Sequence, residues 1–475
     1  MLLTLVIVYW VVSVGIGLVA ARWVRSTADF AVAGRMMPMY VVTATVFATW
    51  FGSETVLGIP ATFLKQGLGG VVADPFGSSL CLILVGLFFA GPLYRKRLLT
   101  IGDYYRQRYN RTVETVISLC IVVSYLGWVG AQIKALGLVF NVVSADAISQ
   151  TTGMLLGAAS ILVYTLYGGM VSVAITDLVQ MVVIVVGMLY IGAEVGAQAG
   201  GVSAVVAHAQ AAGKLEFWPA LDPVAILGFV AALITMMLGS IPQQDVFQRV
   251  MSSRTVKIAM ASSVLGGVLY FGFAFVPMFL AYSATLVDPQ LVARHIDADS
   301  QLILPQFIIA HAPMAAQILF FGALLSAIKS CASATLLAPS VTFAENIAKP
   351  LLPEMDDRGF LRLMRVVIVG FTAVVLVYAL NTEASIFQMV ENAYKVTLVA
   401  AFVPLVAGLY WKRANSAGGM AAMFCGLAVW LALQAFAPDA AVPPQLAGVL
   451  ASATGMVAGS LWPQRAARRA SGAGA

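Results

Sequence analysis

The sequence predicts an all-α membrane protein with thirteen transmembrane helices, ten of which form a core of two inverted five-helix repeats. Three observations lead to this prediction. The 475-residue chain is 61% hydrophobic and only 10% charged, whereas a soluble domain carries about 25% charged residues. Its apolar segments recur at the length that a membrane helix needs. Two of these segments are interrupted by glycine and proline at matching places.

Thirteen segments reach the length of about 20 mostly apolar residues that spans a bilayer. In chain order they are centred in residues 2–22, 39–63, 76–94, 113–142, 151–167, 171–195, 224–244, 257–284, 313–345, 363–381, 384–411, 416–436 and 443–463. The first has no charge before its apolar run, and Arg22 and Arg25 follow it. A secretory signal has the opposite order, so we expect an uncleaved first helix.

Basic residues sort onto one set of alternate loops. That set holds most of the 27 lysines and arginines: Arg22, Arg25, Arg35, Arg95, Lys96, Arg97, Arg106, Arg108, Arg111, Arg249, Arg254, Lys257, Lys349, Arg358, Arg362, Arg365, Lys412, Arg413, Arg465, Arg468 and Arg469. The opposite loops hold Lys65, Lys214 and Arg294. Because cytoplasmic loops carry the excess of positive charge, we expect the N-terminus outside and the C-terminus in the cytoplasm. The net charge of +6 therefore reflects topology and does not indicate nucleic-acid binding.

Two interruptions indicate where a solute would bind. Residues 57–60 read LGIP late in the second segment, and residues 238–242 read LGSIP late in the seventh. Proline inside a helix removes a backbone hydrogen bond and clashes with the preceding turn. Matching breaks in two halves of a transporter indicate inverted repeats with the binding site at the breaks. The broken helices are then the first and the sixth of the core.

The predicted organisation follows from this core. We expect a leading helix and cytoplasmic loop at 1–38, a first five-helix repeat at 39–198, an external loop at 199–223, a second five-helix repeat at 224–411, two additional helices at 412–463 and a cytoplasmic tail at 464–475. Because five helices separate matching elements, the second repeat has the opposite orientation in the membrane.

Six ionisable residues fall within the predicted segments: Glu54, Lys134, Asp177, Lys329, Glu391 and Lys395. A charge at this depth costs roughly 2.5–3.5 kcal/mol on insertion scales, so such residues usually face a cavity or a partner. Lys329 lies near the centre of the apolar run GALLSAIKSCASATLL at 322–337. The structural interpretation is simplest for Lys395, which lies four residues after Glu391 and is well placed for an ion pair on one helix.

Five stretches resemble the sodium:solute symporter family, in the family's order. They are FATWFGSETVLGIPATFLKQGLGG (47–70), TIGDYYRQRYN (100–110), YGGMVSVAITDLVQ (167–180), IPQQDVFQRVMSSR (241–254) and FVPLVAGLYWKRANSAGGMAAMFCG (402–426). The resemblance implies thirteen helices, an external N-terminus, a ten-helix inverted-repeat core and cation-driven uptake of a solute.

The resemblance also implies an ion site made by two helices. One sodium position of the family corresponds here to backbone carbonyls and small side chains of Ala48, Phe51, Ala327, Ser330 and Cys331. Carbonyl and hydroxyl oxygens suit a hard cation. Asp177, in the stretch that resembles T-D-x-x-Q, corresponds to an aspartate that the family links to a second or inner sodium position.

Two residues depart from the family at this site. Cys331 places a thiol, which is a soft and poor ligand for a hard cation, where the family has a hydroxyl. Lys329 replaces an apolar residue. Three roles are open for Lys329. It is a fixed cation that makes the carrier sodium-independent or turns it to protons, or it binds the carboxylate of an anionic solute, or it pairs with Glu54, Asp177 or Glu391.

The solute pocket is expected beside the breaks. The residues expected to line it or to couple it to the ion are Lys329, Glu54, Thr55, Gln243, Gln244, Tyr394 and, near it, Lys395. Sugar-carrying relatives have Gln and Asn where this chain has Thr55 and Met236, which removes two polar groups that a sugar would need. We therefore expect a small organic acid or an amino acid rather than a sugar.

Together these features predict a secondary active transporter of the cell membrane that imports its solute by alternating access, and not an enzyme. The coupling ion is sodium, or protons if Lys329 replaces sodium; no other cofactor, no nucleic acid and no obligate protein partner is expected. The alternative is a transporter-like membrane sensor that acts with a separate signalling partner. An ion channel fits less well, because broken helices with single scattered charges do not form the rings that line a pore.

Overall fold

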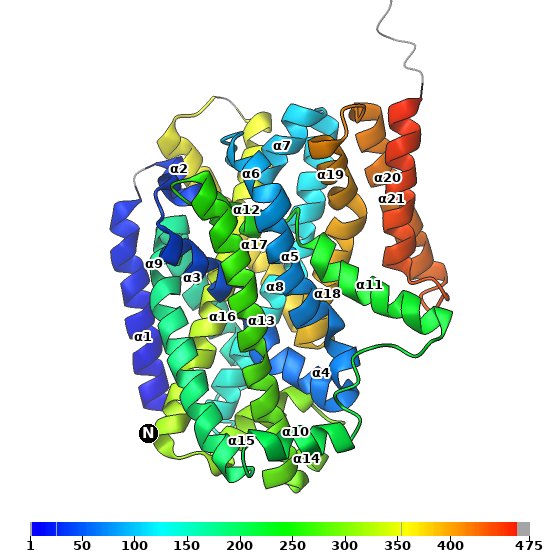
Figure 1. Ribbon diagram of the computed structural model, residues 1–475. Helices are drawn as coiled ribbons and strands as arrows, with labels where there is room; N and C mark the ends of the chain where they lie inside the picture. The colour runs from blue at the N-terminus through cyan, green and yellow to red at the C-terminus, as the bar shows by residue number, and fades with distance from the viewer. Residues whose placement is uncertain (1, 25, 353, 463–475) are drawn as a thin grey trace, which may run out of the picture.

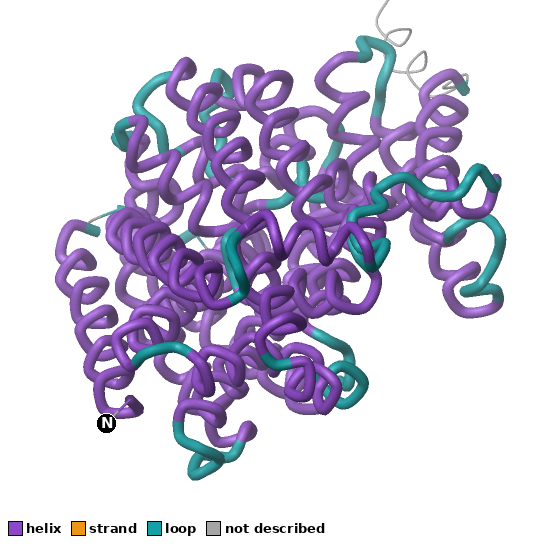
Figure 2. The backbone as a smooth tube through the Cα atoms, turned by 60° about the horizontal axis from the view of Figure 1, so that its bottom comes forward, coloured by secondary structure: helices purple, strands orange, loops and turns teal. Residues whose placement is uncertain are grey.

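The computed structural model describes residues 2–24, 26–352 and 354–462. Within these residues the chain forms helices joined by short loops, and one isolated backbone bridge joins Met37 to Ser253. Figure 1 shows the long helices lying side by side along one direction, and Figure 2 shows helices in every part of the molecule. The prediction of an all-helical protein is confirmed for the part of the chain that is described.

The long helices lie in the predicted apolar segments, and several short helices lie in the loops between those segments. The α-helices of the first half are α1 Leu2–Ala20, α2 Thr27–Val32, α3 Met39–Trp50, α4 Ile59–Gln66, α5 Ser78–Leu84, α6 Ala90–Tyr94, α7 Ile101–Arg108, α8 Arg111–Val143, α9 Gln150–Gln198 and α10 Val202–Ala211. Those of the second half are α11 Pro223–Gly239, α12 Gln244–Met251, α13 Val256–Val287, α14 Pro289–His295, α15 Ile303–His311, α16 Met314–Thr342, α17 Asp357–Asn381, α18 Ile386–Thr397, α19 Val403–Tyr410, α20 Ser416–Phe436 and α21 Pro444–Leu461.

Several of these helices are joined by π-helical turns, which widen the helix locally. They are η3 Glu54–Gly58, η5 Val72–Gly77, η6 Val85–Phe89, η8 Phe343–Ala348 and η10 Leu398–Phe402. The short 3-10 turns are η1 Ala21–Trp23, η2 Ala33–Arg35, η4 Leu68–Val71, η7 Ser300–Leu302 and η9 Lys349–Leu351. Single π turns inside helices often mark functional sites, and η3 follows the first helix break directly.

Nine helices of the described residues are long and apolar enough to cross a bilayer, or ten if the bent pair α11 and α12 counts as one span. The shortfall against thirteen has a physical cause. α3 has 12 residues because the chain breaks after Trp50, and α21, in the predicted segment 443–463, has 18 residues and is not among these spans. The first limb of α9 runs from Gln150 to the turn at Gly169 and covers the predicted segment 151–167. Thirteen spans therefore remain a prediction.

α9 is two limbs joined at a sharp turn. A straight helix of its 49 residues would be about 74 Å long, more than twice the thickness of a bilayer core. Gly169 has a φ of +50° and a ψ of −163°, which is not helical. Both ends of α9 lie at the same end of the molecule, since Gln150 shares a cavity with Gln301 and Gln198 donates a hydrogen bond to the carbonyl of His311. The chain therefore reverses at Gly169.

α16 forms the centre of the bundle. In its most apolar stretch 89% of the residues are buried, against 22% in α1 and in α20. It packs against α1, α3, α8, α9, α12 and α17. Its many small residues let these neighbours approach closely, as is usual where helices meet inside a membrane. Any ionisable side chain on α16 therefore lies inside the protein and not in lipid.

The first helix break lies earlier than predicted. α3 ends at Trp50, Phe51 leaves the helix with φ −81° and ψ 77°, and the helix resumes near Ser53. Pro60 of the LGIP stretch stands in the first turn of α4. The π turn η3 accommodates this proline. The Ile59 N–H bonds to the carbonyl of Glu54, five residues back, so the regular α-helical bonding pattern is already interrupted directly before Pro60. The second break, from Ser240 to Gln243, contains the predicted Pro242.

Arg249, predicted to be a cytoplasmic loop residue, is buried: its side chain lies in α12 with 1% of its surface exposed. The helix that follows the second break turns inward, bent 46° from α11, and carries Arg249 with it. The predicted tail at 464–475, with Arg465, Arg468 and Arg469, lies outside the described residues, as does Arg25.

Candidate ion and solute site at the helix breaks

The first break is stabilised by a side chain from another helix. The Ser53 N–H donates to Gln132 Oε1 of α8 at 3.0 Å, and Gln132 Nε2 donates to Glu54 Oε2 at 2.9 Å. Backbone groups freed by a break need partners inside a membrane protein. Gln132 therefore orders the broken segment and orients the Glu54 carboxylate with one amide group.

The second break is held in a similar way. Gln243 Nε2 donates to Ser124 Oγ of α8 at 3.0 Å and to Thr397 Oγ1 of α18 at 3.2 Å. Thr397 Oγ1 in turn donates to the carbonyl of Gly239 at 2.7 Å, at the end of α11. Gln243 thus stabilises the second break, because its side chain bonds to both α8 and α18.

Asp177 of α9 lies among oxygen atoms from two other helices, α3 and α16. Thr45 Oγ1 of α3 donates to Asp177 Oδ2. Ser330 Oγ of α16 donates to Asp177 Oδ1 at 2.6 Å and lies 3.2 Å from the carbonyl oxygen of Ala48. A carboxylate, a carbonyl and two hydroxyls are the hard oxygen donors that a hard cation prefers. The structure thus brings together three predicted ion-site residues, Ala48, Ser330 and Asp177.

Two buried cations lie near this oxygen cluster. Arg249 Nε donates to Thr49 Oγ1 of α3 at 2.8 Å, and its Nη1 lies 3.3 Å from the carbonyl oxygen of Asp245. Lys329 Nζ donates to Ser13 Oγ of α1. Both positive charges act electrostatically on Asp177. Of the three partners proposed for Lys329 pairing, Asp177 is the one whose charge acts on it.

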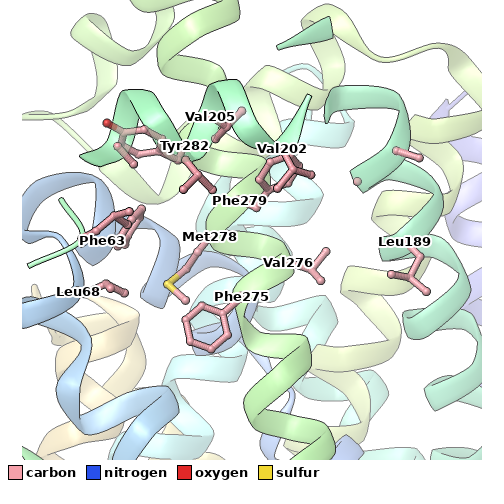
Figure 3. Close-up of a pocket in the computed structure, with 15 residues that line it drawn as sticks. Phe63, Leu68, Leu189, Val202, Val205, Phe275, Val276, Met278, Phe279 and Tyr282 are labelled. Carbon is pink, nitrogen blue, oxygen red and sulfur yellow. The ribbon is translucent and has the colours of Figure 1, made fainter. Parts of the chain in front are cut away.

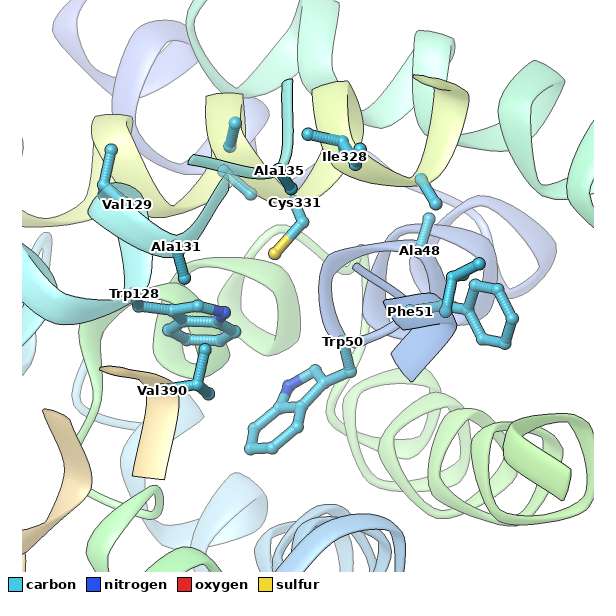
Figure 4. Close-up of a cluster of buried hydrophobic side chains, with 14 of the residues drawn as sticks. Ala48, Trp50, Phe51, Trp128, Val129, Ala131, Ala135, Ile328, Cys331 and Val390 are labelled. Atoms are coloured by element: carbon cyan, nitrogen blue, oxygen red, sulfur yellow. The ribbon is translucent and has the colours of Figure 1, made fainter. Parts of the chain in front are cut away.

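Cys331 faces the first break. A Cβ atom at Gly52 would lie 2.8 Å from Cys331 Sγ and 2.8 Å from Glu54 Oε2, so thiol and carboxylate both approach the backbone of Gly52. Figure 4 shows the sulfur directed into the space between Trp128 and the end of α3. The thiol therefore lies on the side of α16 that faces Glu54. Phe51 and Ala327, predicted to offer carbonyls, are fully buried on the same two elements.

A second carboxylate lies beyond Glu54. Thr55 Oγ1 is 3.0 Å from Tyr270 Oη of α13, and Tyr270 Oη donates to Asp74 Oδ1 at 2.7 Å. Glu54 and Asp74 are each 1% exposed. Thr55 is thus at the break as predicted, and it is tied to an acidic residue that precedes the helix α5.

Aromatic rings gather at the same break. Trp50 and Tyr394 are stacked with centroids 6.0 Å apart, and Trp128 meets Trp50 at 5.7 Å and Tyr394 at 5.3 Å. Tyr125 stacks on Trp128 at 6.0 Å. Tyr394 Oη is buried and has no hydrogen-bond partner among the described residues. A buried hydroxyl without a partner is costly, so this group is available to a ligand. We call Trp50, Trp128 and Tyr394 the aromatic cluster.

Two predicted site residues lie elsewhere. Gln244 Oε1 accepts from the Ile101 N–H of α7 at 2.8 Å, so it joins α12 to that short helix. Lys395 Nζ lies 3.5 Å from Glu391 Oε1 and bonds to Asn392 Oδ1 at 2.8 Å. The structural interpretation of Lys395 as an ion-pair partner is confirmed. Glu391 itself is only partly buried and lines an outer cavity.

That outer cavity is polar and is lined by the end of η3 and by α4, the segment that follows the first break. Its volume is about 670 Å³, and it is lined by residues that include Gly58, Lys65, Lys134, Gln301, Glu383 and Glu391. A different pocket of about 530 Å³, between α9, α10 and α13, is lined almost wholly by carbon atoms such as those of Phe63, Phe275 and Phe279 (Figure 3). The polar cavity, unlike the apolar pocket, includes Gly58 of η3, the π turn that follows the break.

Sequence reasoning missed several residues of the site. Asp74 and Asp245 are buried acids that were not counted as intramembrane charges, because each stands at the edge of an apolar segment. Thr45, Gln132 and Tyr270 act only through tertiary contacts, and their residue types are common in such helices. A Pro directly after Asp74 was the one signal in the chain that pointed to a special backbone there.

A model of the sodium:solute symporter family matches residues 30–426, more than four fifths of the chain. The chain belongs to the sodium:solute symporter family. It is similar to the human high affinity choline transporter 1, with 27% identity over 416 residues that cover 83% of this chain and 69% of the relative. It is also similar to the sodium/pantothenate symporter of Escherichia coli, with 27% identity and 96% coverage of both chains.

Other similarities agree with this membership. The sodium/proline symporter of Haemophilus influenzae is 25% identical over 434 residues, which cover 86% of this chain and 84% of the relative. The structure of a Na⁺-coupled sialic acid symporter aligns with a TM-score of 0.80 at 20% identity and covers 97% of this symporter and 96% of that chain. A nucleobase–cation symport transporter aligns with a TM-score of 0.59 at 14% identity, covering 91% and 95%.

Membership settles three expectations. The protein is a membrane-spanning symporter of a transporter family and not an enzyme, and sodium is the coupling ion of that family. The relatives named above are carriers, so the sensor alternative gains no support from them.

Proposed function

We propose that this symporter imports a small organic solute that carries an ammonium or quaternary ammonium group, driven by sodium and by alternating access. The observation that carries the proposal is the meeting of two broken helices at one buried place, where an oxygen cluster lies beside a carboxylate and an aromatic cluster. Broken helices supply unpaired backbone groups for ions and solutes.

The sodium site is proposed at Asp177. Support comes from the oxygens around it, which belong to Thr45, Ala48 and Ser330. The carbonyls of Phe51 and Ala327 are proposed as further ligands, since both residues are buried beside this cluster. Cys331 is a weak ligand, because a thiol is soft and its sulfur faces Gly52 and Glu54.

The solute site is proposed at Glu54, Thr55 and the aromatic cluster. Carboxylates and ring faces attract an organic cation, and aromatic cages are a frequent means of binding quaternary ammonium groups. The two nearby cations make their described bonds to Ser13 and Thr49, away from Glu54. An organic acid therefore becomes the less favoured solute, while an amino acid stays in favour, because its amino group is cationic.

Two of the relatives named above carry solutes of this class, whereas the pantothenate and sialic acid symporters carry carboxylic acids. Choline has a quaternary ammonium group and proline a secondary ammonium group, and carriers of both are among the similar proteins. Gln243 and Gln244 are proposed to support the second break, not to contact the solute, because both side chains bond to other helices.

The proposed topology keeps thirteen spans, with an external N-terminus and a cytoplasmic C-terminus. Two five-helix repeats at 39–198 and 224–411 would place the breaks in corresponding helices. Support comes from the position of the basic loops, since α7 and the loop before α20 lie together at the end of the molecule opposite α10, α14 and α15 (Figure 1). Cytoplasmic loops are those that carry the lysine and arginine excess.

Uptake by the purified full-length chain in proteoliposomes tests the proposal. Labelled choline and proline would be offered with an inward sodium gradient, and with N-methylglucamine in place of sodium. We expect one of the two to accumulate above its outside concentration only with the gradient. Equal uptake in both media would contradict sodium coupling, and uptake of neither solute, together with uptake of a carboxylic acid, would contradict the proposed solute class.

Variants sharpen the test of the site. Glu54→Gln keeps the size of the side chain and removes the charge, so solute affinity should fall. Glu391→Gln is the matched control, because Glu391 is a partly exposed glutamate of the outer cavity. Similar loss in both variants would mean that the effect is general and that Glu54 has no special role.

A further inference from the structure

The leading helix α1 has one buried face, which carries a single serine toward α16. Most of α1 faces outward, but Val6, Trp10 and Ser13 are at most 8% exposed. These residues recur at the spacing of one helical face. α1 packs on α9 and α16, and it stands at the edge of the bundle beside α9 in Figure 1. It also precedes residue 30, where the match to the family begins.

Ser13 is the polar centre of this face. Its Oγ accepts a hydrogen bond from Lys329 Nζ of α16 and lies 3.2 Å from Gln180 Nε2 of α9. One turn earlier, Tyr9 Oη is hydrogen-bonded to Ser326 Oγ of α16. A hydroxyl oxygen has two lone pairs, so Ser13 can accept both bonds at once. The ammonium of Lys329 is thereby bonded to a helix that contributes nothing else to the site.

The position of that ammonium matters to the proposed sodium site. Lys329 directly precedes Ser330, which bonds to Asp177, and the charges of Lys329 and Asp177 act on each other. The other charges that bear on this place are Arg249 of α12, beside Asp177, and Asp177 itself. The repulsion between an ammonium and a bound sodium ion rises as they approach, and it is strong in a low-dielectric interior.

We propose that Ser13 is a positioning residue that sets the sodium affinity of the symporter by holding the Lys329 ammonium against α1. With Ser13 in place, the ammonium is directed toward the leading helix. Without this acceptor, one hydrogen bond that draws the ammonium toward α1 is lost, so the attraction of Asp177 has more weight on its position and the ammonium competes more strongly with sodium. The leading helix thus tunes an ion site to which it supplies no ligand. This inference rests on the proposed sodium site at Asp177.

A double-mutant cycle tests the proposal in proteoliposomes, with the half-saturating sodium concentration and the solute KM measured separately. We expect Ser13→Ala to raise half-saturating sodium about two- to tenfold with the solute KM at saturating sodium little changed. Lys329→Met should lower half-saturating sodium, because it removes the repulsion. The double variant should match Lys329→Met, since the proposed effect of Ser13 on sodium passes through Lys329.

Two controls separate this role from a structural one. Ser13→Thr keeps the acceptor and should restore the sodium response of the original chain, whereas Val11→Ala alters an exposed residue of the same helix and should change nothing. A sodium response that is equal in Ser13→Ala and in the unaltered chain would overturn the inference while leaving the proposed function intact. Additive effects of the two substitutions would overturn it as well. A lack of sodium dependence in the unaltered chain would refute the proposed function itself.

Discussion

Two buried carboxylates of this symporter, Asp177 and Glu54, lie beside neighbouring residues of α16, Ser330 and Cys331, in very different surroundings. Asp177 is bonded to hydroxyls of Thr45 and Ser330, and two cations act on it. Glu54 is bonded to the amide of Gln132 and lies near the thiol of Cys331 and the ring of Trp128. The first set of atoms suits a small hard ion, and the second suits an organic group with an apolar surface. The difference would let the proposed sodium site and the proposed solute site lie in one buried region without exchanging their ligands.

The largest effect should come from Asp177→Asn, which removes the charge and keeps the shape. We expect sodium affinity to fall more than about tenfold, which corresponds to about 1.4 kcal/mol, and sodium-driven uptake to reach background. Sodium-dependent thermal stability would measure it, since a ligand of the folded state stabilises by mass action. Asp146→Asn, in an exposed loop, is the matched control. A sodium response that survives in Asp177→Asn would place the ion elsewhere.

The next largest effect should come from the aromatic cluster. Trp50→Leu removes a ring face at the break, and cation–π contacts are worth about 0.5–2 kcal/mol. We expect solute affinity to fall roughly two- to thirtyfold, while the stabilisation by sodium is kept. Isothermal titration with choline or proline at fixed sodium would show it. If Trp50→Leu weakened sodium as much as solute, the separation of the two carboxylate sites would be wrong.

A smaller, opposite effect is expected for Cys331→Ser. A hydroxyl is a harder donor than a thiol, so half-saturating sodium should fall a few-fold if residue 331 reaches the ion. Because the sulfur faces Gly52 and Glu54, no change in sodium affinity would assign residue 331 to the solute side. Cys425→Ser, at an exposed cysteine, is the control, and uptake at graded sodium concentrations is the measurement.

The smallest transport effect is expected for Lys395→Met. Its ion pair with Glu391 spans 3.5 Å and both side chains are partly exposed. Pairs of this kind contribute about 0–1 kcal/mol. Uptake at graded sodium and solute concentrations should show both affinities changed less than twofold. A larger change in either would mean that Lys395 belongs to the binding site.

A third carboxylate, Asp288, lies outside the membrane, unlike Asp177 and Glu54. It allows a pH test of how a partner changes the properties of a carboxylate. His311 hydrogen-bonds to Asp288 at 2.8 Å and lowers the pKa of that carboxyl. A lowered pKa stabilises the fold above the unfolded value of about 3.9 and loses that effect as pH falls through the folded value. Thermal stability should therefore drop more between pH 5 and 3 in the unaltered chain than in Asp288→Asn. Equal slopes would contradict this contribution.

The sequence alone predicted the helices well, because membrane helices must be long and apolar. Residues 416–436 were predicted and found as α20, and the kink at 240–243 lies where Pro242 was read. The first break was misplaced, since Pro60 fits a π turn and the chain leaves the helix at Phe51 without a proline.

The site was only partly predictable from sequence. Asp177 and Ser330 were identified from motifs and do lie together. Arg249 was assigned to a loop, because charge sorting assumes that arginine beside a span is exposed. The role of Ser13 had no signal at all, because a serine in an apolar helix is ordinary and its partner lies more than 300 residues away.

The turn at Gly169 has a consequence for how the chain enters the membrane. Its φ of +50° favours glycine, and a Cβ there would lie 2.6 Å from the ring of Phe30 in α2. No loop separates the two limbs of α9. One limb therefore cannot enter the membrane while the other stays in the water phase at the end of a flexible connection. Biogenesis must therefore deliver them as one helical hairpin. A bulkier residue at 169 would be expected to fail at insertion, before the question of transport arises.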